Sequence, residues 1–144
     1  MAIYISGHVE GDVQISRQFM GLETNLENFH KPLDKSRKQL LKTTDANFGV
    51  AGALMGGWQP RTQIYSWPLL QRTGRMRGDF RSSVKVSRME IWNPTPYFKY
   101  HQSNRPRRKL PRRVMLKIIA QDKRRIMKFF HEWLVDEVRE SRRS

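Results

Sequence analysis

The sequence predicts an α+β fold, in which a small mixed or antiparallel sheet packs with two N-terminal helices and a C-terminal helix, and a long extended arm leaves this body. Three observations indicate it. Short stretches alternate between apolar and polar residues, longer segments repeat apolar residues at helical spacing, and the two kinds do not alternate strictly along the chain. The 144 residues are enough for one hydrophobic core, so we expect a single domain over residues 1–144.

Strand patterns occur in several short segments. Residues 2–9 alternate weakly and predict a first strand, and residues 83–92 alternate as a half-buried strand does. The prolines and asparagine of residues 93–96 predict a turn, after which residues 97–101 return as the second strand of a hairpin. Residues 114–119, VMLKII, are mostly apolar and β-branched and predict one more buried strand.

Three segments have the periodicity of amphipathic helices. Asp12 can cap a helix from Val13, which places four apolar residues on one face: Ile15, Phe19, Leu22 and Leu26. Pro32 suits the first turn of a second helix, which should continue to the glycine pair at residues 56–57. Asp122 can cap the last helix, which carries a wide apolar stripe.

The rest of the chain is predicted to lack regular structure. Residues 58–81 contain prolines and glycines without a sustained period, which predicts a long arm with a short helical turn near residues 68–72. Residues 103–113 contain six basic residues and two prolines and should form an exposed basic loop. We also expect residues 139–144 to fray. A small domain with this much extended chain generally uses it to cover neighbouring subunits.

The composition limits the function. Twenty-eight Lys and Arg against thirteen Asp and Glu give a formal net charge of +15, which favours contact with nucleic acid or acidic protein surfaces; a solvated basic face is the alternative. The most apolar stretch, residues 48–58, is too short for a membrane helix, which needs about 20 residues. The N-terminal residues lack the pattern of a secretory signal. We therefore expect no membrane contact and a protein that stays in the cell that makes it.

Signatures of catalysis and of ligand binding are missing from the sequence. It contains no cysteine, its four histidines lack short metal-ligand spacings, and no phosphate-binding loop, dinucleotide fingerprint or GxSxG elbow occurs. We therefore predict no catalytic residue, no metal, no cofactor and no enzymatic activity. A hydrolase that uses His101 is the weakest alternative, because no acidic partner accompanies this histidine in sequence.

A series of short motifs resembles the phage virion morphogenesis family, whose members are tail completion proteins. The segment YSWPLLQRTGRMRGDF, residues 65–80, precedes a predicted strand, and NPTPYFKYHQSN, residues 93–104, follows it, in the order of the family's motifs. The matching positions are Pro68, Leu69, Leu70, Thr73, Gly74, Met76, Phe80, Tyr97, His101 and Gln102. Residues 47–60 and 110–116 are similar to further motifs, so the resemblance covers residues 47–138.

The resemblance implies a bacteriophage virion protein of the neck or tail end, which forms a ring that completes the tail or joins it to the head, and which catalyses nothing. Its partners would be copies of itself in a homo-oligomeric ring, a hexamer or a dodecamer, together with neighbouring neck, connector or tail-terminator proteins and, through non-specific contact, packaged DNA. We expect assembly in the host cytoplasm and a final location in the virion. A basic nucleic-acid-binding module without catalytic activity is the alternative.

Two sets of residues are candidates for these contacts. The set expected at subunit interfaces joins aromatic and apolar residues of the arm with motif positions: Trp58, Tyr65, Trp67, Leu69, Leu70, Arg75, Tyr97, His101 and Gln102. For the aromatic residues, the alternative is that they fill the core of their own subunit. The set expected to contact polyanions comprises Arg105, Arg107, Arg108, Lys109, Arg112 and Arg113.

Overall fold

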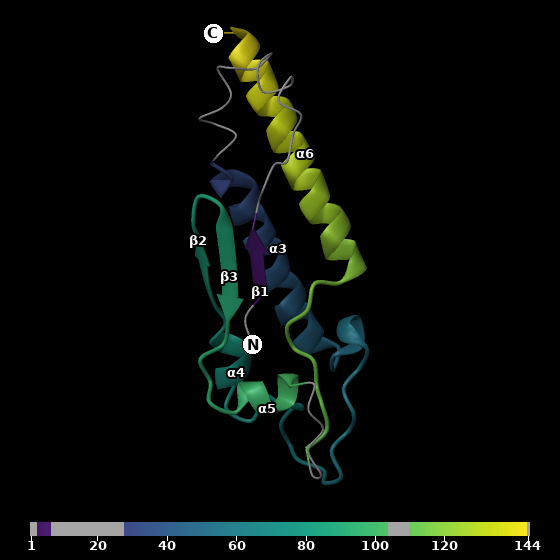
Figure 1. The fold of residues 1–144 in the computed structure, drawn as a ribbon. Coiled ribbons are helices and arrows are strands. Elements are labelled where there is room, and N and C mark those ends of the chain that lie inside the picture. The colour runs from purple at the N-terminus through teal and green to yellow at the C-terminus, as the bar shows by residue number, and fades with distance from the viewer. Residues whose placement is uncertain (1–2, 7–27, 104–109, 144) are drawn as a thin grey trace.

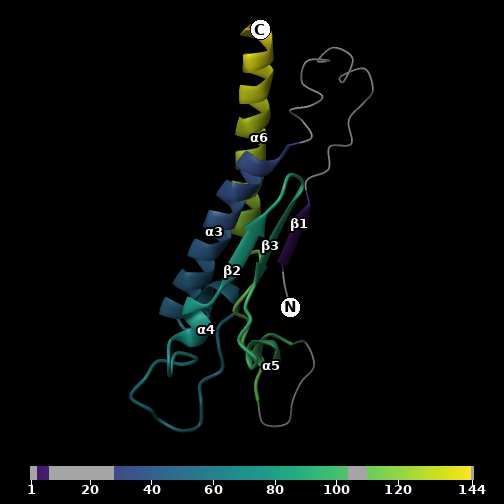
Figure 2. The ribbon, with the colours of Figure 1, turned by 90° about the vertical axis from the view of Figure 1, so that its left-hand side faces the viewer.

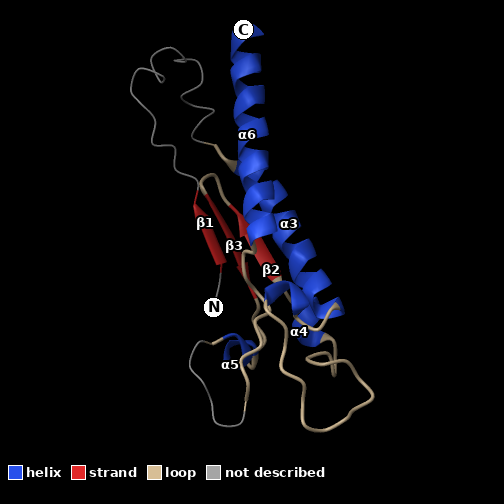
Figure 3. Ribbon diagram, turned by 90° about the vertical axis from the view of Figure 1, so that its right-hand side faces the viewer, coloured by secondary structure: helices blue, strands red, loops and turns tan. Residues whose placement is uncertain are grey.

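The computed structural model describes residues 3–6, 28–103 and 110–143. In this part of the chain, three strands form an antiparallel sheet in the order β1-β3-β2, α3 packs on the sheet, and α6 packs beside α3 (Figures 1 and 3). The fold is therefore mixed α+β, as the sequence predicts. The helix predicted from Val13 lies outside the described residues.

The sheet is built around β3 (Arg88–Trp92), which lies between β1 (Ile3–Ser6) and β2 (Arg81–Val84). Met89 and Ile91 of β3 are fully buried, because alternate residues of a strand face the same side of the sheet. The first predicted strand is confirmed by β1.

The strand predicted over residues 83–92 is confirmed only for residues 88–92, which form β3, because a turn separates them from the end of β2. β2 and β3 form a tight hairpin, and the N–H of Lys85 donates to the carbonyl of Arg88 at 2.7 Å. The apolar–polar alternation continues through the turn, where Val86 is 54% exposed. Periodicity therefore made the two strands and their turn look like one strand.

The returning strand predicted at residues 97–101 is also wrong. These residues belong to a short helix, α5 (Phe98–Gln102), and its first residue is buried. The side chain of Asn93 accepts the N–H of Thr95 at 3.0 Å, and the carbonyl of Thr95 accepts the N–H of Phe98 at 3.1 Å. These bonds turn the proline-rich segment into a helical turn instead of a strand.

The second predicted helix is α3 (His30–Gly49), which ends before its predicted stop at the glycine pair. Its C-terminus is closed by the N–H of Gly52, which donates to the carbonyl of Asn47 at 2.8 Å from a left-handed backbone with φ of 79°. A separate 3-10 helix, η2 (Ala53–Met55), follows.

The last predicted helix is α6 (Ala120–Arg143), which includes residues 139–143, the segment expected to fray. Asp122, only 1% exposed, accepts hydrogen bonds from Thr43 Oγ1 at 2.8 Å and Gln39 Nε2 at 3.1 Å. Because both donors belong to α3, Asp122 fixes the first turn of α6 against that helix.

The strand predicted over residues 114–119 is wrong, because this segment pairs with none of the three strands that the structure describes. The side chain of Gln102 bonds its backbone instead: Oε1 accepts the N–H of Met115 at 2.8 Å, and Nε2 donates to the carbonyl of Leu116 at 2.6 Å. The segment is an extended connection between α5 and α6, in which Met115 and Leu116 are buried.

The arm, residues 56–74, lies at the end of the molecule opposite the C-terminus of α6 (Figures 1 and 2). The predicted arm continued to residue 81, but a short helix, α4 (Arg75–Gly78), and then β2 form its last part. The N–H of Gln71 donates to the carbonyl of Pro68 at 3.0 Å, so a turn does form near residues 68–72.

No helix in the described part of the chain is long and apolar enough to cross a membrane.

Candidate subunit-contact site

A cavity of about 320 Å³, which we call the arm pocket, lies where the arm, α4 and α5 meet. Its lining consists of Trp67, Leu70, Arg72, Thr73, Met76, Tyr97 and His101. Four of these residues, from two separate motifs, were predicted for subunit interfaces: Trp67, Leu70, Tyr97 and His101. A mostly apolar pocket with a few polar groups suits an apolar side chain that must be held in one orientation.

The arm has its own cluster of aromatic and arginine side chains. Tyr65 and Trp67 stack, with ring centroids 4.6 Å apart. The guanidinium of Arg61 lies 5.0 Å from the centre of the Tyr65 ring and also donates to the carbonyl of Trp67. On the other flank, Arg72 lies 5.3 Å from the centre of the Trp67 ring. These contacts hold an otherwise irregular loop in a defined shape.

Exposed apolar side chains gather on this arm. Ile64 is completely exposed, and the neighbouring Tyr65 is 43% exposed. Tyr97, at the rim of the arm pocket, is 38% exposed. A single exposed apolar residue is ordinary, but two neighbouring ones on the arm and a third at the rim of the pocket indicate a surface that makes contacts.

Two of the predicted interface residues, Trp58 and Gln102, are buried inside their own subunit. Trp58 donates from Nε1 to the carbonyl of Val114 at 2.8 Å and meets the ring of Phe48 edge-on, with centroids 5.1 Å apart. Gln102 bonds the connection to α6, as described above. For Trp58 the alternative interpretation, an aromatic that fills its own core, is the one that the structure supports.

The remaining interface candidates differ in exposure. Leu69 and Leu70 are half-buried and pack against the core. Arg75 is exposed at the start of α4, where its N–H donates to Thr73 Oγ1 at 3.3 Å, and its guanidinium forms no ion pair with any described residue. Arg75 is therefore free to contact a partner, whereas the two leucines mainly hold the arm to the body.

The polyanion candidates are only partly described. Arg105, Arg107, Arg108 and Lys109 lie outside the described residues. Arg112 is exposed, but Arg113 is 5% exposed and donates to the carbonyl of Gln59 from Nε at 3.0 Å and Nη2 at 2.9 Å. Burial and the nearby Arg61 charge lower the pKa of Arg113. The prediction is corrected for Arg113, which ties the arm to the connection before α6 and is not available to a polyanion.

His101 lies half-buried in the wall of the arm pocket, and its Nδ1 is buried without a hydrogen-bond partner in the described structure. Burial, and then the positive charge of Arg113, lower the pKa of His101 below its ordinary value. The neutral ring is therefore favoured in the folded protein. Among the described residues, no group of His, Asp and Glu side chains could hold a metal ion.

This lowered pKa predicts a pH dependence of stability. Below about pH 6.5 the unfolded chain takes up a proton at His101 that the folded chain still excludes, so the unfolding temperature should fall as the pH falls toward the lower pKa of the folded state. Thermal unfolding from about pH 7.5 to pH 5 measures this slope. His101→Gln should flatten it, and His131→Gln, at an exposed position of α6, should not. Equal slopes in the wild type and His101→Gln would contradict the assignment.

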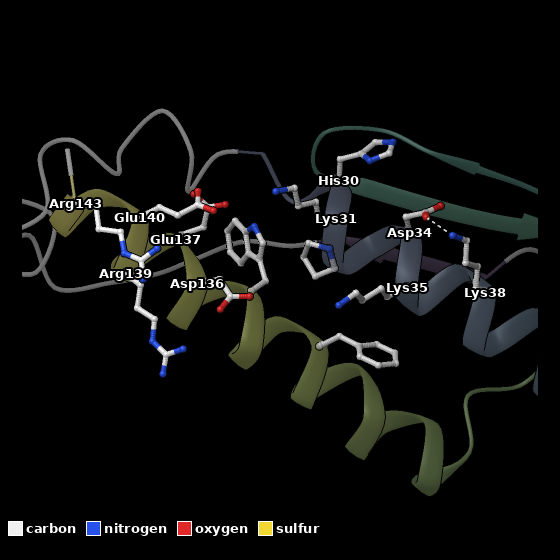
Figure 4. Close-up of a pocket in the computed structure, with 13 residues that line it drawn as sticks. His30, Lys31, Asp34, Lys35, Lys38, Asp136, Glu137, Arg139, Glu140 and Arg143 are labelled. Carbon is white, nitrogen blue, oxygen red and sulfur yellow. Dashed lines mark ion pairs between the residues drawn. The ribbon is translucent and has the colours of Figure 1, made fainter.

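A larger cavity of about 550 Å³ opens between the N-terminal turns of α3 and the C-terminal half of α6, and we call it the wedge (Figure 4). Lysines, a histidine and Asp34 extend from α3, and three carboxylates together with Arg139 and Arg143 extend from α6 (Figure 4). Phe129 and Trp133 also line the cavity. No motif of the sequence predicts this cavity. The only signal was a run of α6 residues at helical spacing, Phe129, Trp133, Glu137 and Glu140, in which aromatic side chains give way to acidic ones on one face.

Comparisons of the chain with protein-family models, with curated proteins and with solved structures found no match. The function is therefore inferred from the motifs, the arm and the two cavities.

Proposed function

We propose that this protein is a structural virion protein of the bacteriophage neck or tail end, a ring subunit that completes the tail or joins it to the head. The observation that carries the proposal is the arm. It presents a fully exposed Ile64 and a 43% exposed Tyr65, and it ends at a pocket lined by residues of two separate motifs. These are the segments through which the sequence resembles the tail completion family.

The arm supports assembly because its exposed apolar groups are costly for an isolated monomer. Burying apolar surface stabilises a contact by about 25 cal/mol per Å². Only a second molecule can cover Ile64, since it has no cover from its own chain. A closed ring covers this surface on every subunit, because each subunit binds the next through one surface and is bound by the previous subunit through a different surface.

The proposed role is non-catalytic. His101, the one histidine in the arm pocket, has no carboxylate among the residues that line the pocket with it, and the hydroxyls there are those of Thr73 and Tyr97. Its unpartnered Nδ1 also lacks the carboxylate that would orient a general base. The pocket is therefore better suited to hold a side chain of a neighbour than to activate a nucleophile.

The proposal is tested by locating the protein and its oligomers. Native mass spectrometry of the purified protein, and electron cryomicroscopy of purified particles, should reveal a closed homo-oligomer at the junction of head and tail. A protein that stays strictly monomeric and is absent from purified virions would contradict the proposal.

A second candidate function, nucleic-acid binding, is favoured by the uneven distribution of charge. Residues 46–78 and 91–121 contain twelve Lys and Arg and no Asp or Glu, so no carboxylate in them opposes a phosphate backbone. The rest of the chain has sixteen basic and thirteen acidic residues. In a ring around DNA, this character would serve non-specific contact with the backbone.

The salt dependence of DNA binding tests this second function. We expect Arg107→Ala, Arg108→Ala and Arg112→Ala together to weaken duplex binding and to reduce the slope of log K against log salt by roughly 0.9 for each phosphate contact that is lost. Arg139→Ala, Arg142→Ala and Arg143→Ala remove the same charge from the far end of α6 and should change the slope less. Equal effects of the two triple variants would indicate that only the net charge matters, and no binding at low salt would exclude the function.

A further inference from the structure

The arm pocket is built from the part of the chain that contains basic residues and no acidic ones. All the residues that line it come from the two stretches that lack Asp and Glu. Of the carboxylates that border the first stretch, Asp45 is paired with Arg77 at 2.8 Å, and Asp79 is paired with Arg81 at 3.3 Å. The potential at the pocket therefore attracts a carboxylate that comes from elsewhere.

Arg72 is the one lining residue with a permanent charge, and the described structure leaves this charge unpaired. Its guanidinium lies 5.3 Å from the centre of the Trp67 ring and forms no hydrogen bond or ion pair with any described residue. Arg61 differs, because it already donates to the carbonyl of Trp67. Contact with an aromatic face leaves the N–H groups of a guanidinium free to donate, so the exposed Arg72 can bind a carboxylate at the rim of the pocket.

The interior of the pocket requires an apolar group. Trp67, Leu70, Met76 and Tyr97 form most of its wall, and Met76 is only 3% exposed. The volume of about 320 Å³ is at the small end of the range of about 300 to 1,000 Å³ in which proteins hold small ligands. A single large side chain is therefore a suitable occupant, provided that a carboxylate near it can contact Arg72.

Residues 18–27 of this chain, which we call the acidic segment, have this combination. They contain Phe19, three further apolar residues, two glutamates and no Lys, Arg or His, in a chain whose formal net charge is +15. They lie outside the described residues. In the helix that the sequence predicts from Val13, Phe19 and Glu23 are one turn apart on the same face. One segment can therefore place an aromatic ring in the pocket and a carboxylate beside Arg72.

The acidic residues of α6 suit the pocket less well. Glu137 is 8% exposed and belongs to the packed face of the helix, and Glu132 lies 3.7 Å from Lys128. The exposed Asp136 and Glu140 stand among the three arginines at the end of α6. A contact through this end of α6 would bring arginines to a pocket that is already positive.

Nucleic acid is also a less suitable occupant. A nucleobase binds to a free aromatic face, but Tyr65 stacks on Trp67 and the guanidinium of Arg72 lies over the same ring. A phosphate backbone requires several cations along its length, and the lining of the pocket supplies one permanent cation.

The acidic segment does not reach the arm pocket of its own subunit. Glu23 is five residues before Asn28, a separation of about 8 Å in a helix and at most about 18 Å in an extended chain. The next helix, α3, has 20 residues and is about 30 Å long. The pocket lies near its far end, since Gln71, beside Arg72, donates to the carbonyl of Phe48 at 3.4 Å (Figures 1 and 2). A contact between Glu23 and Arg72 therefore joins two copies of the chain.

We propose that the acidic segment of one subunit docks in the arm pocket of the next, with Phe19 in the cavity and Glu23 on Arg72. This inference rests on the proposed ring and names the contact that builds it. The contact joins two different surfaces, the heterologous type that closes into a ring. Arg75, which is exposed and has no ion partner among the described residues, follows the lining residue Thr73 by two positions and is available to the second glutamate of the segment.

Disulfide trapping tests the contact directly, because the chain contains no cysteine. A double variant, Met20→Cys with Thr73→Cys, should form covalent dimers and higher oligomers when the assembled protein is oxidised. The control pair is Met20→Cys with Arg124→Cys, which places the second thiol on an exposed part of α6 outside the pocket lining and should give far fewer cross-links. Equal cross-linking of both pairs, or of neither, in a protein that still assembles would overturn the docking and leave the ring function standing.

Charge reversal tests the ion pair. Arg72→Glu and Glu23→Arg should each weaken self-association by at least about tenfold, because repulsion replaces a charge-assisted hydrogen bond. The variant with both changes should recover most of the wild-type affinity, since every contact then carries the pair in reverse. Arg124→Glu makes the same change in net charge away from the pocket and should weaken association much less. Sedimentation velocity measures these affinities, and a double variant as weak as the two single losses combined would contradict the contact.

The remaining outcomes identify the alternatives. A cross-link between Met20→Cys and Thr73→Cys within one monomer would assign the pocket to the segment of its own subunit and would overturn docking by a neighbour. An Arg72→Glu variant that assembles normally but binds duplex DNA more weakly would assign Arg72 to nucleic acid and would also overturn the docking. Wild-type protein that is monomeric and absent from virions contradicts the ring function itself.

Discussion

Gln102→Ala should lower the free energy of unfolding by about 3 to 5 kcal/mol, although the residue is polar and belongs to a short helix. Its side chain accepts the N–H groups of Met115 and Leu116 at 2.8 and 3.2 Å and donates to the carbonyl of Leu116 at 2.6 Å. Alanine would leave three buried backbone groups without partners, and each costs about 1 to 3 kcal/mol. Partial access of water to the cavity reduces the sum.

Chemical denaturation measures this loss, and Gln121→Ala is the matched control. Gln121 is the same residue type at an exposed position in the first turn of α6, so its truncation should change stability by less than about 0.5 kcal/mol. The unfolding of Gln102→Ala should also begin in the connection before α6, which hydrogen exchange at Met115 and Leu116 can detect. Equal stability of the two variants would mean that water replaces the side chain.

The helices were the part of the fold that the sequence predicted best. Apolar residues repeat at helical spacing over both α3 and α6, and this pattern can be recognised without knowledge of the tertiary contacts. The end of α3 was misplaced because a left-handed residue, Gly52, closes the helix, while the more prominent glycine pair follows several residues later. A glycine signal shows that a helix can end, but not which glycine ends it.

The strands were predicted less well, for a physical reason that differs from one to the next. In the hairpin, Val86 continues the alternation of Val84 although it is exposed in the turn, so periodicity conceals the turn. Within residues 114–119, Met115 and Leu116 are buried as predicted, but a glutamine side chain takes the place of a partner strand. Burial follows from the composition of a segment, whereas pairing depends on what the fold brings beside it.

The candidate site was predicted in part. Trp67, Leu70, Tyr97 and His101 line one pocket, and nothing in their spacing along the sequence predicts that they meet. The positive charge of Arg113 predicted a polyanion contact, but the guanidinium donates two hydrogen bonds to the carbonyl of Gln59 inside the protein. The wedge depends on how far α6 diverges from α3 toward its C-terminus, and an angle between two helices leaves little trace in the sequence of either.

Gly52→Ala should destabilise the protein by about 3 kcal/mol or more, because two independent costs meet at this position. The residue has φ of 79°, which costs an L-amino acid about 1 to 2 kcal/mol. In addition, a Cβ atom there would overlap the indole of Trp58, which is held by its bond to the carbonyl of Val114 and by its contact with Phe48. Overpacking of a fixed core ring typically costs about 1 to 3 kcal/mol more.

Gly56→Ala separates these two costs. Gly56 also has a left-handed backbone, with φ of 99°, but nothing lies within 4 Å of a Cβ atom built there. The loss in Gly56→Ala therefore measures backbone strain alone, and the excess loss in Gly52→Ala measures the clash with Trp58. Trp58→Leu replaces the indole by a smaller side chain and removes the clash. The double variant Gly52→Ala with Trp58→Leu should therefore lose less stability than the sum of the losses in the two single variants. Strict additivity would mean that the indole moves aside freely, and Trp58 would then not be the fixed element that joins η2 to the connection before α6.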